Sequence, residues 1–209
     1  RGVEGPLGTN NGNNMQNPLY KAFIEAGHKA GYLKTDDYNG YQQEGFGRMD
    51  MTIKNGVRSS TSNAYLKPAM SRPNLSVETH ALTTRILLEG KRAVGVEYRQ
   101  GNTTHRVKAN REVILSAGAV GSPHILMLSG IGPAGHLKQM GIEVNHDLPG
   151  VGENLQDHLE VWVQQACTQP VTLKSVFNPV SKFLIGARWF FFKTGLGATN
   201  HFESCGFIR

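Results

Sequence analysis

Cysteine is almost absent from this 209-residue chain, which contains only Cys167 and Cys205. Neither belongs to a C-x-x-C pair, so the sequence indicates neither a disulfide scaffold nor a thiolate zinc site. We expect both thiols to be buried in the protein. The eight histidines contain no H-E-x-x-H spacing, and no metal site is predicted.

Charged residues are also sparse, at 18% of the chain against the ~25% typical of soluble domains. The 22 Lys and Arg residues outnumber the 16 Asp and Glu residues, which gives a formal net charge of +6. This surplus is modest and is not concentrated in a basic tract. A nucleic-acid partner is therefore not expected.

Long hydrophobic runs are missing as well. A membrane-spanning helix needs at least ~18 apolar residues, and the nearest candidate, residues 183–192, is interrupted by Arg188. Any membrane contact is therefore expected to be peripheral.

The first residues lack the apolar core of a signal peptide, and the last ones resemble an interrupted strand. We expect an internal piece of a longer protein.

Glycine, in contrast, is abundant, with 25 residues in the chain, a share well above the ~7% average. Hydrophobic residues make up 39% of the sequence, which is enough to form a core. The length suits one or two domains. Global disorder is excluded by this composition.

Local patterns predict several elements. Asn17 and Pro18 begin an amphipathic helix that ends at Gly31. Residues 36–56 are expected to be rich in loops, and residues 59–69 have a weaker helical pattern. Further along the chain, we expect an antiparallel meander in residues 75–116, strands at 113–115 and 159–166, an aromatic helix at 180–192, and a loop leading into a strand at 198–208.

A strand, a glycine turn and a helix follow one another between residues 113 and 128. Ser122 is predicted to be the helix N-cap and Pro123 the first helical residue. The glycines at 118 and 121 allow either a close approach of the backbone to a ligand or simply a tight connection. Residues 130–135 fit G-x-G-x-x-G, but they follow a helix and not a strand, so they lack the context of a dinucleotide fingerprint.

Other candidate sites remain open on the residues alone. No serine lies in a G-x-S-x-G elbow. His158 is either a base or, more in keeping with its setting, a structural histidine. The aromatic helix at 180–192 is expected to belong to the core, and a cation-binding pocket and a membrane-surface role are its alternatives. The last alternative rests on Lys182, Arg188 and Lys193 in the same stretch.

The segment from Gly118 to Gly132 reads GAxxSPxILxxSGIG. It resembles the second signature of the glucose-methanol-choline (GMC) oxidoreductases, and residues 148–158 resemble a further segment of that family. Several other stretches are similar to its choline-oxidising members, namely residues 17–20, 42–47, 92–98 and 197–203. The resemblance covers nearly the whole chain.

This resemblance implies an α/β (mixed α+β) fold in which an FAD-binding α/β domain is interleaved with a substrate domain built on an antiparallel sheet. The fold would be incomplete at both ends. Residues 1–69 would be a mixed segment, mainly of the substrate domain with flavin-proximal loops. Residues 70–150 would form part of the FAD-binding domain with its small β-meander, and residues 151–209 would start the substrate-binding domain.

The resemblance also implies site residues. The backbone near Thr83 would face the adenine of FAD, and Ala117 and Gly118 would pass close to the dinucleotide. Glu203 resembles the family glutamate that faces the trimethylammonium group of choline. Phe202 and Trp189 are candidate aromatic faces for the same group.

The implied reaction is FAD-dependent oxidation of choline to betaine aldehyde and on towards glycine betaine. Electrons would pass to a membrane acceptor such as a quinone, at the mitochondrial inner membrane or the bacterial cytoplasmic membrane. The family's G-x-G-x-x-G and its catalytic His lie outside this sequence, so no catalytic residue is assigned and the chain is expected to be inactive alone. Another GMC alcohol dehydrogenase and a truncated, non-catalytic module are the alternatives.

Overall fold

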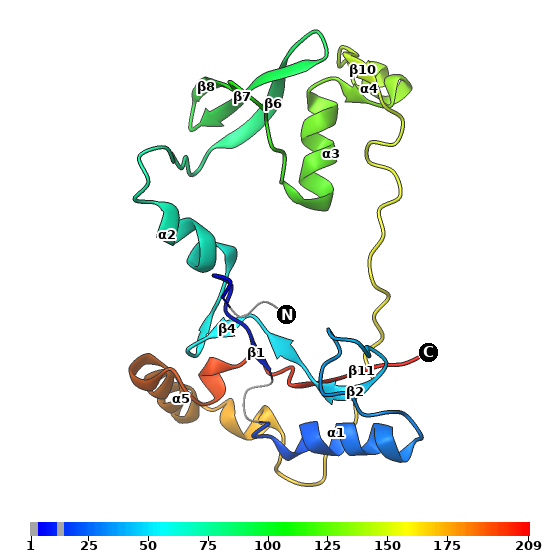
Figure 1. Cartoon of the computed structure of the whole chain (residues 1–209), viewed down its shortest axis with the longest axis vertical. Helices are drawn as coiled ribbons and strands as arrows, with labels where there is room; N and C mark the ends of the chain where they lie inside the picture. Colours follow the sequence, from blue (N-terminus) through cyan, green and yellow to red (C-terminus); the bar gives the residue numbers. More distant parts are fainter. Residues whose placement is uncertain (1–3, 12–14) are drawn as a thin grey trace. The chain divides into compact units, whose positions relative to one another are not determined.

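The computed structural model describes residues 4–11 and 15–209. The chain divides into two compact units (Figure 1): unit 1 comprises Arg1–Ser76 and Val163–Arg209, and unit 2 comprises Val77–Trp162. Unit 1 is therefore built from both ends of the chain. The division predicted from the family resemblance, at residues 69 and 150, concerns interleaved cofactor and substrate domains and stays a prediction.

The first helix of unit 1, α1 (Pro18–Lys29), confirms the prediction from the sequence. The side chain of Asn17 accepts a hydrogen bond from the backbone N–H of Leu19 at 2.9 Å, which satisfies a donor that the first turn leaves free. The helix packs on Phe46, whose ring centroid lies 5.2 Å from that of Phe23. A methyl group on Gly27 would collide with the Phe46 ring, so the close approach depends on this glycine.

Short strands lie where the sequence predicted loops. Residues 45–47 are buried because their strand pairs antiparallel with the last strand of the chain, in the register Gly45 to Phe207. The prediction of a loop-rich stretch is confirmed for residues 36–44, which contain no helix or strand, and is wrong at residues 45–48, because the local pattern does not reveal a partner so far away in the sequence. The strand predicted within 198–208 is confirmed. The strands of unit 1 are β1 (Asn10–Asn11), β2 (Gly45–Arg48), β3 (Asp50–Met51), β4 (Ile53–Lys54), β5 (Val57–Arg58) and β11 (Ser204–Phe207).

Unit 1 also contains the helical segments predicted at 59–69 and 180–192. The first is a π-helical turn, η1 (Ser62–Leu66), that continues into α2 (Lys67–Ala69). The second is α5 (Pro179–Phe192), capped by the Asn178 side chain, which accepts from the backbone N–H of Ser181 at 2.8 Å. Two 3-10 turns flank it, η2 (Leu173–Val176) and η3 (Leu196–Ala198).

Unit 2 begins with the predicted meander. The strands β6 (Leu82–Glu89), β7 (Arg92–Gln100) and β8 (Thr103–Lys108) form an antiparallel sheet in the order β6-β7-β8. Gly90 and Gly101 occupy the two turns with φ of 57° and 55°, a conformation that favours glycine. This prediction is confirmed.

The rest of unit 2 contains two helices, one short parallel strand pair and long segments without regular structure. α3 (Gly118–Leu128) packs against β6, and β9 (Ile131–Gly132), α4 (Ala134–Gln139) and β10 (His146–Asp147) follow. Ser122 is not the N-cap, because the helix begins at Gly118 and the Ser122 hydroxyl accepts from the backbone N–H of Ala117 at 3.0 Å. Leu137 is completely buried and is the largest such side chain among the described residues.

Two predicted strands are not formed. Residues 113–115 and 159–166 have no strand structure, and Ile114 is 78% exposed. A strand needs a neighbour to receive its backbone hydrogen bonds, and no described segment pairs with either stretch.

The expectation of buried thiols also fails for Cys167, which is exposed, while Cys205 is half-buried. No helix among the described residues is long and apolar enough to cross a bilayer.

Candidate functional site

The residues predicted for function fall into two groups. Glu203 belongs to unit 1, whereas Thr83, Ala117 and Gly118 belong to unit 2. Each group is described within its own unit.

Glu203 is a buried carboxylate, only 3% exposed. It lies one residue before β11, and its backbone oxygen accepts from the N–H of Met49 at 3.0 Å. Its Oε2 accepts from the backbone N–H of Met15 at 3.0 Å, and its Oε1 accepts from the hydroxyl of Thr199 at 2.9 Å. Both donors, the Met15 backbone N–H and the Thr199 hydroxyl, are neutral. The two hydrogen bonds therefore orient the carboxylate without neutralising its charge.

A second layer of contacts holds the turn that carries this carboxylate. The Thr199 hydroxyl oxygen also accepts from the backbone N–H of His201 at 3.1 Å, and the hydroxyl of Tyr20 donates to the His201 carbonyl at 2.8 Å. Burial, and then the negative charge of Glu203, raise the pKa of Tyr20 above its ordinary value of 10.0. Tyr20 therefore stays protonated near neutral pH and can act as this donor.

The two candidate aromatic faces differ in their surroundings. Phe202, next to Glu203, is 64% exposed. Trp189 is held by a hydrogen bond from its Nε1 to the Gly56 carbonyl at 2.8 Å, and the Lys193 ammonium lies 3.9 Å from its ring centroid. One face of Trp189 thus already carries a cation–π contact inside the chain.

In unit 2, the glycine turn predicted to approach the cofactor is open. Ala117 and Gly118 are exposed, Gly118 has a φ of 85°, and a Cβ built there would meet nothing within 4 Å. The first amides of α3 follow directly. Such a turn leaves the backbone free to contact a bound group, and helix amides favour anions.

Beside this turn lies a cavity of about 870 Å³. Its walls are the N-terminal half of α3, including Ala119, Pro123 and His124, and the segment 152–156. Two segments of the sequence that resemble the family thus share one cavity. A flavin dinucleotide is an elongated anion with a pyrophosphate, and the open turn, the helix amides and the cavity fit such a group.

Thr83 lies on β6, the strand that packs against α3, and is paired with Tyr98 of β7. The structure therefore brings Thr83 into the same unit as Ala117 and Gly118. Whether these three residues bind the cofactor, and whether Glu203 binds substrate, stay predictions.

Ser129 is a residue whose role the sequence did not reveal. It is 4% exposed, and its hydroxyl accepts from the backbone N–H of Ile86 at 2.8 Å while donating to the Ile125 carbonyl at 2.6 Å. The Ser129 carbonyl accepts from the Asn145 side chain at 2.9 Å. Ser129 therefore fastens the end of α3 to the outer edge of the β6 strand. Its fixed place in the signature was the signal available in the sequence.

Comparison with known proteins decides the family. The family model for GMC oxidoreductases matches residues 1–160, which is most of the chain. The chain belongs to the GMC oxidoreductase family. This confirms the resemblance found in the sequence.

Curated relatives match the GMC chain over its full length. It is 63% identical to the oxygen-dependent choline dehydrogenase of Photobacterium profundum, covering 100% of this chain and 37% of that protein. It is 59% identical to the enzyme of the same name from Brucella anthropi, covering 100% of this chain and 38% of that protein. The chain thus spans less than two fifths of these relatives.

Solved structures share the fold. An FAD-dependent oxidoreductase from Chaetomium thermophilum is 30% identical, with a TM-score of 0.81 over 99% of this chain and 37% of that one. A formate oxidase from Aspergillus oryzae is 24% identical, with a TM-score of 0.87 over 100% and 37%. The predicted GMC-type α/β fold is confirmed, and the family together with its FAD-dependent neighbours supports FAD as the cofactor.

Proposed function

We propose that this chain is part of an FAD-dependent choline dehydrogenase that oxidises choline to betaine aldehyde and on towards glycine betaine. The observation that carries the proposal is the buried carboxylate of Glu203, held by two neutral donors. The names of the curated relatives support the same substrate.

The chemistry of choline suits this carboxylate. A quaternary ammonium group has no N–H and cannot donate a conventional hydrogen bond, so recognition must rely on charge and on aromatic faces. A carboxylate ~5 Å from the cation contributes about 3 kcal/mol at an effective dielectric constant near 20. An aromatic face adds ~0.5–2 kcal/mol, and the exposed ring of Phe202 is the available candidate beside Glu203.

For the cofactor, we propose that Ala117, Gly118 and the backbone near Thr83 hold the dinucleotide, with the first turn of α3 facing its phosphates. Bound FAD would supply the hydride acceptor for the carbinol carbon. In this assignment the residues of the chain orient the dinucleotide and the choline, and the burial of Glu203 keeps water away from its carboxylate. It supplies no catalytic base, so we expect the chain by itself to be inactive.

Electrons are proposed to pass to a membrane quinone, which would place the enzyme at the mitochondrial inner membrane or the bacterial cytoplasmic membrane. The names of the relatives contain the word oxygen-dependent, so oxygen is the second candidate acceptor. Hydrogen peroxide release in air, compared with anaerobic reduction of a quinone analogue, separates the two.

A substrate panel on the full-length protein tests the proposal. Choline should reduce the bound flavin and a soluble dye under anaerobic conditions, faster than 3,3-dimethylbutan-1-ol, its neutral isostere, and faster than simple primary alcohols. Preference for an uncharged alcohol would indicate another GMC alcohol dehydrogenase. A protein without bound flavin or choline-dependent reduction would indicate a non-catalytic module.

A further inference from the structure

α5 carries an apolar face that nothing in the described chain covers. Five large side chains form this surface, which we term the exposed stripe, and each is between 60% and 73% exposed: Val180, Phe183, Leu184, Phe190 and Phe191. At about 100° per residue, their positions fall within an arc of about 120° on one side of the helix. The sequence predicted a core helix here, and that prediction was wrong for this face.

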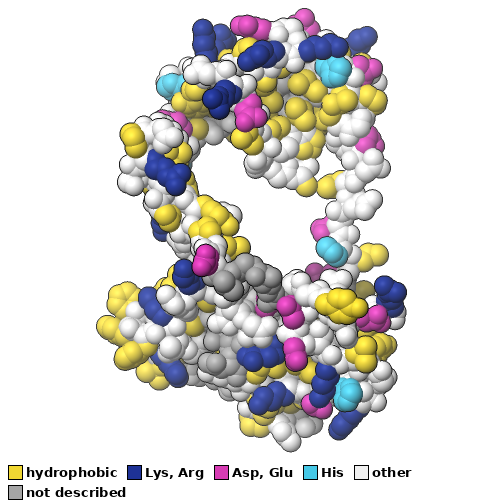
Figure 2. All heavy atoms as spheres, viewed as in Figure 1, with side chains coloured by type: hydrophobic (Ala, Val, Ile, Leu, Met, Phe, Trp, Pro, Cys, Tyr) yellow, Lys and Arg dark blue, Asp and Glu magenta, His cyan; other side chains and the backbone are white. Residues whose placement is uncertain are grey.

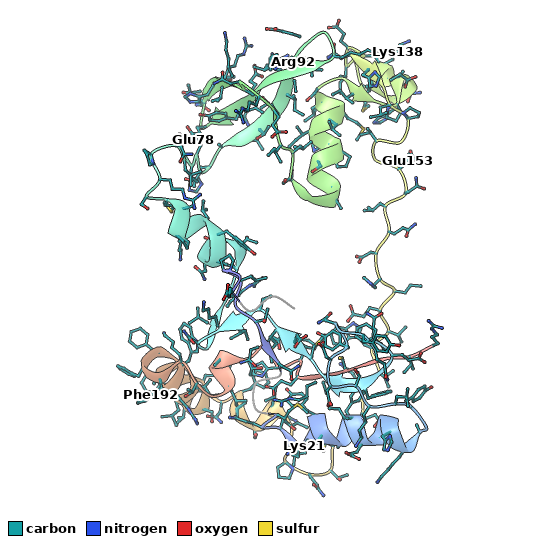
Figure 3. All side chains as sticks on the ribbon, viewed as in Figure 1. Lys21, Glu78, Arg92, Lys138, Glu153 and Phe192 are labelled. Carbon is teal, nitrogen blue, oxygen red and sulfur yellow. The ribbon has the colours of Figure 1, made fainter. Side chains whose placement is uncertain are left out.

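The opposite side of α5 holds the helix against the rest of unit 1 through Trp189. Trp189 bonds to the Gly56 carbonyl, and a Cβ on Gly197 of η3 would lie 2.8 Å from the Trp189 Cβ. The helix is therefore anchored to unit 1 through one face and exposes the other. Figure 2 shows hydrophobic side chains gathered over α5, and Figure 3 shows Phe192 at its C-terminal end. Exposed apolar patches of this kind mark interaction surfaces.

The charge around the exposed stripe indicates the occupant. From residue 161 to residue 202 the sequence contains no Asp or Glu, but it contains Lys174, Lys182, Arg188 and Lys193. Lys182 and Arg188 lie on α5, and Lys193 is its C-cap. Lys182 extends along an aromatic ring, with its Nζ 5.6 Å from the Phe177 centroid. Along this stretch of sequence the charged side chains are all cations, with Lys182 and Lys193 on the same side of the helix as Trp189 and the exposed stripe on the other. An apolar face accompanied by cations and by no carboxylates suits a lipid surface whose headgroups are anionic.

We propose that the exposed stripe docks the full-length protein on an anionic lipid bilayer, with α5 lying in the plane of the interface. A 14-residue helix of this composition can bury its apolar face ~5–10 Å into the headgroup boundary without spanning the membrane. The inference deepens the proposed function, because an enzyme that reduces a membrane quinone must approach the bilayer. It names the surface that makes the approach.

Sedimentation with vesicles tests the proposal on the full-length, flavin-loaded protein. We expect the protein to pellet with vesicles of phosphatidylcholine mixed with phosphatidylglycerol, and much less with phosphatidylcholine alone or at high salt. Replacing Phe183, Phe190 and Phe191 together by Ser should weaken binding at least tenfold. Tyr41→Ser is the matched control, because Tyr41 is a fully exposed aromatic residue of unit 1 outside α5.

The charge contribution has its own pair of variants. Lys182→Gln should weaken binding to the anionic vesicles about fivefold, the effect expected of one cation near such a surface. Lys138→Gln, which removes an exposed cation of α4 in unit 2, should leave it unchanged. Since all the replaced side chains are exposed, folding should persist, and Phe191→Ser alone provides a milder variant.

Three outcomes would overturn the docking proposal. The first is a wild-type protein that remains in the supernatant with every vesicle. The second is a triple variant that binds as well as the wild type. The third is a triple variant that loses a dimer or a protein complex and keeps its vesicle binding. Choline-dependent reduction of a soluble dye is measured on the same samples. If the wild-type protein binds vesicles but choline does not reduce the dye, the proposed function is rejected and the docking surface is retained. If choline reduces the dye but the protein does not bind vesicles, only the docking proposal is rejected.

Discussion

The carboxylate of Glu203 accepts a hydrogen bond from the backbone N–H of Met15 at 3.0 Å, although 188 positions separate the two residues. The candidate substrate carboxylate is therefore oriented by the opposite end of the chain. Thr199, only four residues earlier, supplies the second donor. One hydrogen bond to the carboxylate is thus local in sequence and the other is long-range. A change at Met15 or at Thr199 would therefore alter the orientation of the Glu203 carboxylate.

Removing the charge of Glu203 tests its assignment most directly. In the full-length enzyme, Glu203→Gln should raise KM for choline by about two orders of magnitude, the equivalent of about 3 kcal/mol. KM for 3,3-dimethylbutan-1-ol should change little, because a neutral substrate gains nothing from the carboxylate. Steady-state kinetics with a soluble dye measure both. Glu25→Gln, an exposed carboxylate of α1, serves as control, and equal losses for both substrates would reject the assignment.

Thr199 should act as a positioning residue for that carboxylate. Thr199→Val removes the hydroxyl that donates to Glu203, and because a hydrogen bond to a charged group contributes ~1.5–3 kcal/mol, KM for choline should rise about tenfold with little change in kcat. Thr199→Ser keeps the hydroxyl and should restore the KM. If Ser and Val variants behave alike, the hydroxyl has no such role.

Ser129 should stabilise unit 2. Ser129→Ala leaves the N–H of Ile86, a residue only 8% exposed, without its acceptor, at a cost of about 1–3 kcal/mol in the free energy of unfolding. Denaturant unfolding measures the cost, and hydrogen exchange should show lost protection along β6. Ser116→Ala replaces an exposed serine and should change stability by less than about 0.5 kcal/mol. Unchanged protection of β6 in the Ser129 variant would contradict the prediction.

Glu97 should make the β6-β7-β8 sheet sensitive to acid. Hydrogen bonds from Arg85 at 3.1 Å, then from Arg106 at 2.9 Å, lower the pKa of Glu97 from 4.5 to about 2. Because the folded pKa lies below the unfolded one, the stabilisation is present above pH 4.5 and is lost as the pH falls towards 2. The melting temperatures of the wild type and Glu97→Gln should therefore converge over that interval. Glu89 is exposed at the end of β6, so the melting temperature of Glu89→Gln should follow that of the wild type at every pH in this interval.

The parts of the fold that the sequence predicted depend on local signals. Asn17 and Pro18 fix the start of α1 within a few residues, and the glycines of the meander mark its turns. The β2 strand was not predicted because its partner, β11, lies at the other end of the chain. Residues 113–115 have the composition of a buried strand, but composition does not provide the neighbour that a strand requires.

The candidate site was predictable only in part. Glu203 was identified by family resemblance, since a single carboxylate near a loop has no distinguishing local pattern. Its burial and its bond to Met15 arise from long-range packing, which no spacing rule reveals. For α5 the sequence pattern was clear but its partner was not. A helical repeat of large apolar residues indicates that one face of the helix is covered, but it does not say whether the protein core or another surface covers it.

The pairing of β2 with β11 also constrains the order of events during synthesis. A ribosome that has made β2 must add some 150 further residues before β11 exists, and at ~5–20 residues per second this takes roughly 8–30 s. All of unit 2 is made within that interval and can fold first. One edge of β2 can pair early with residues 33–35. The edge that receives β11 stays without its partner until the residues around Glu203 are made, and an unpaired strand edge of this kind can pair with another chain.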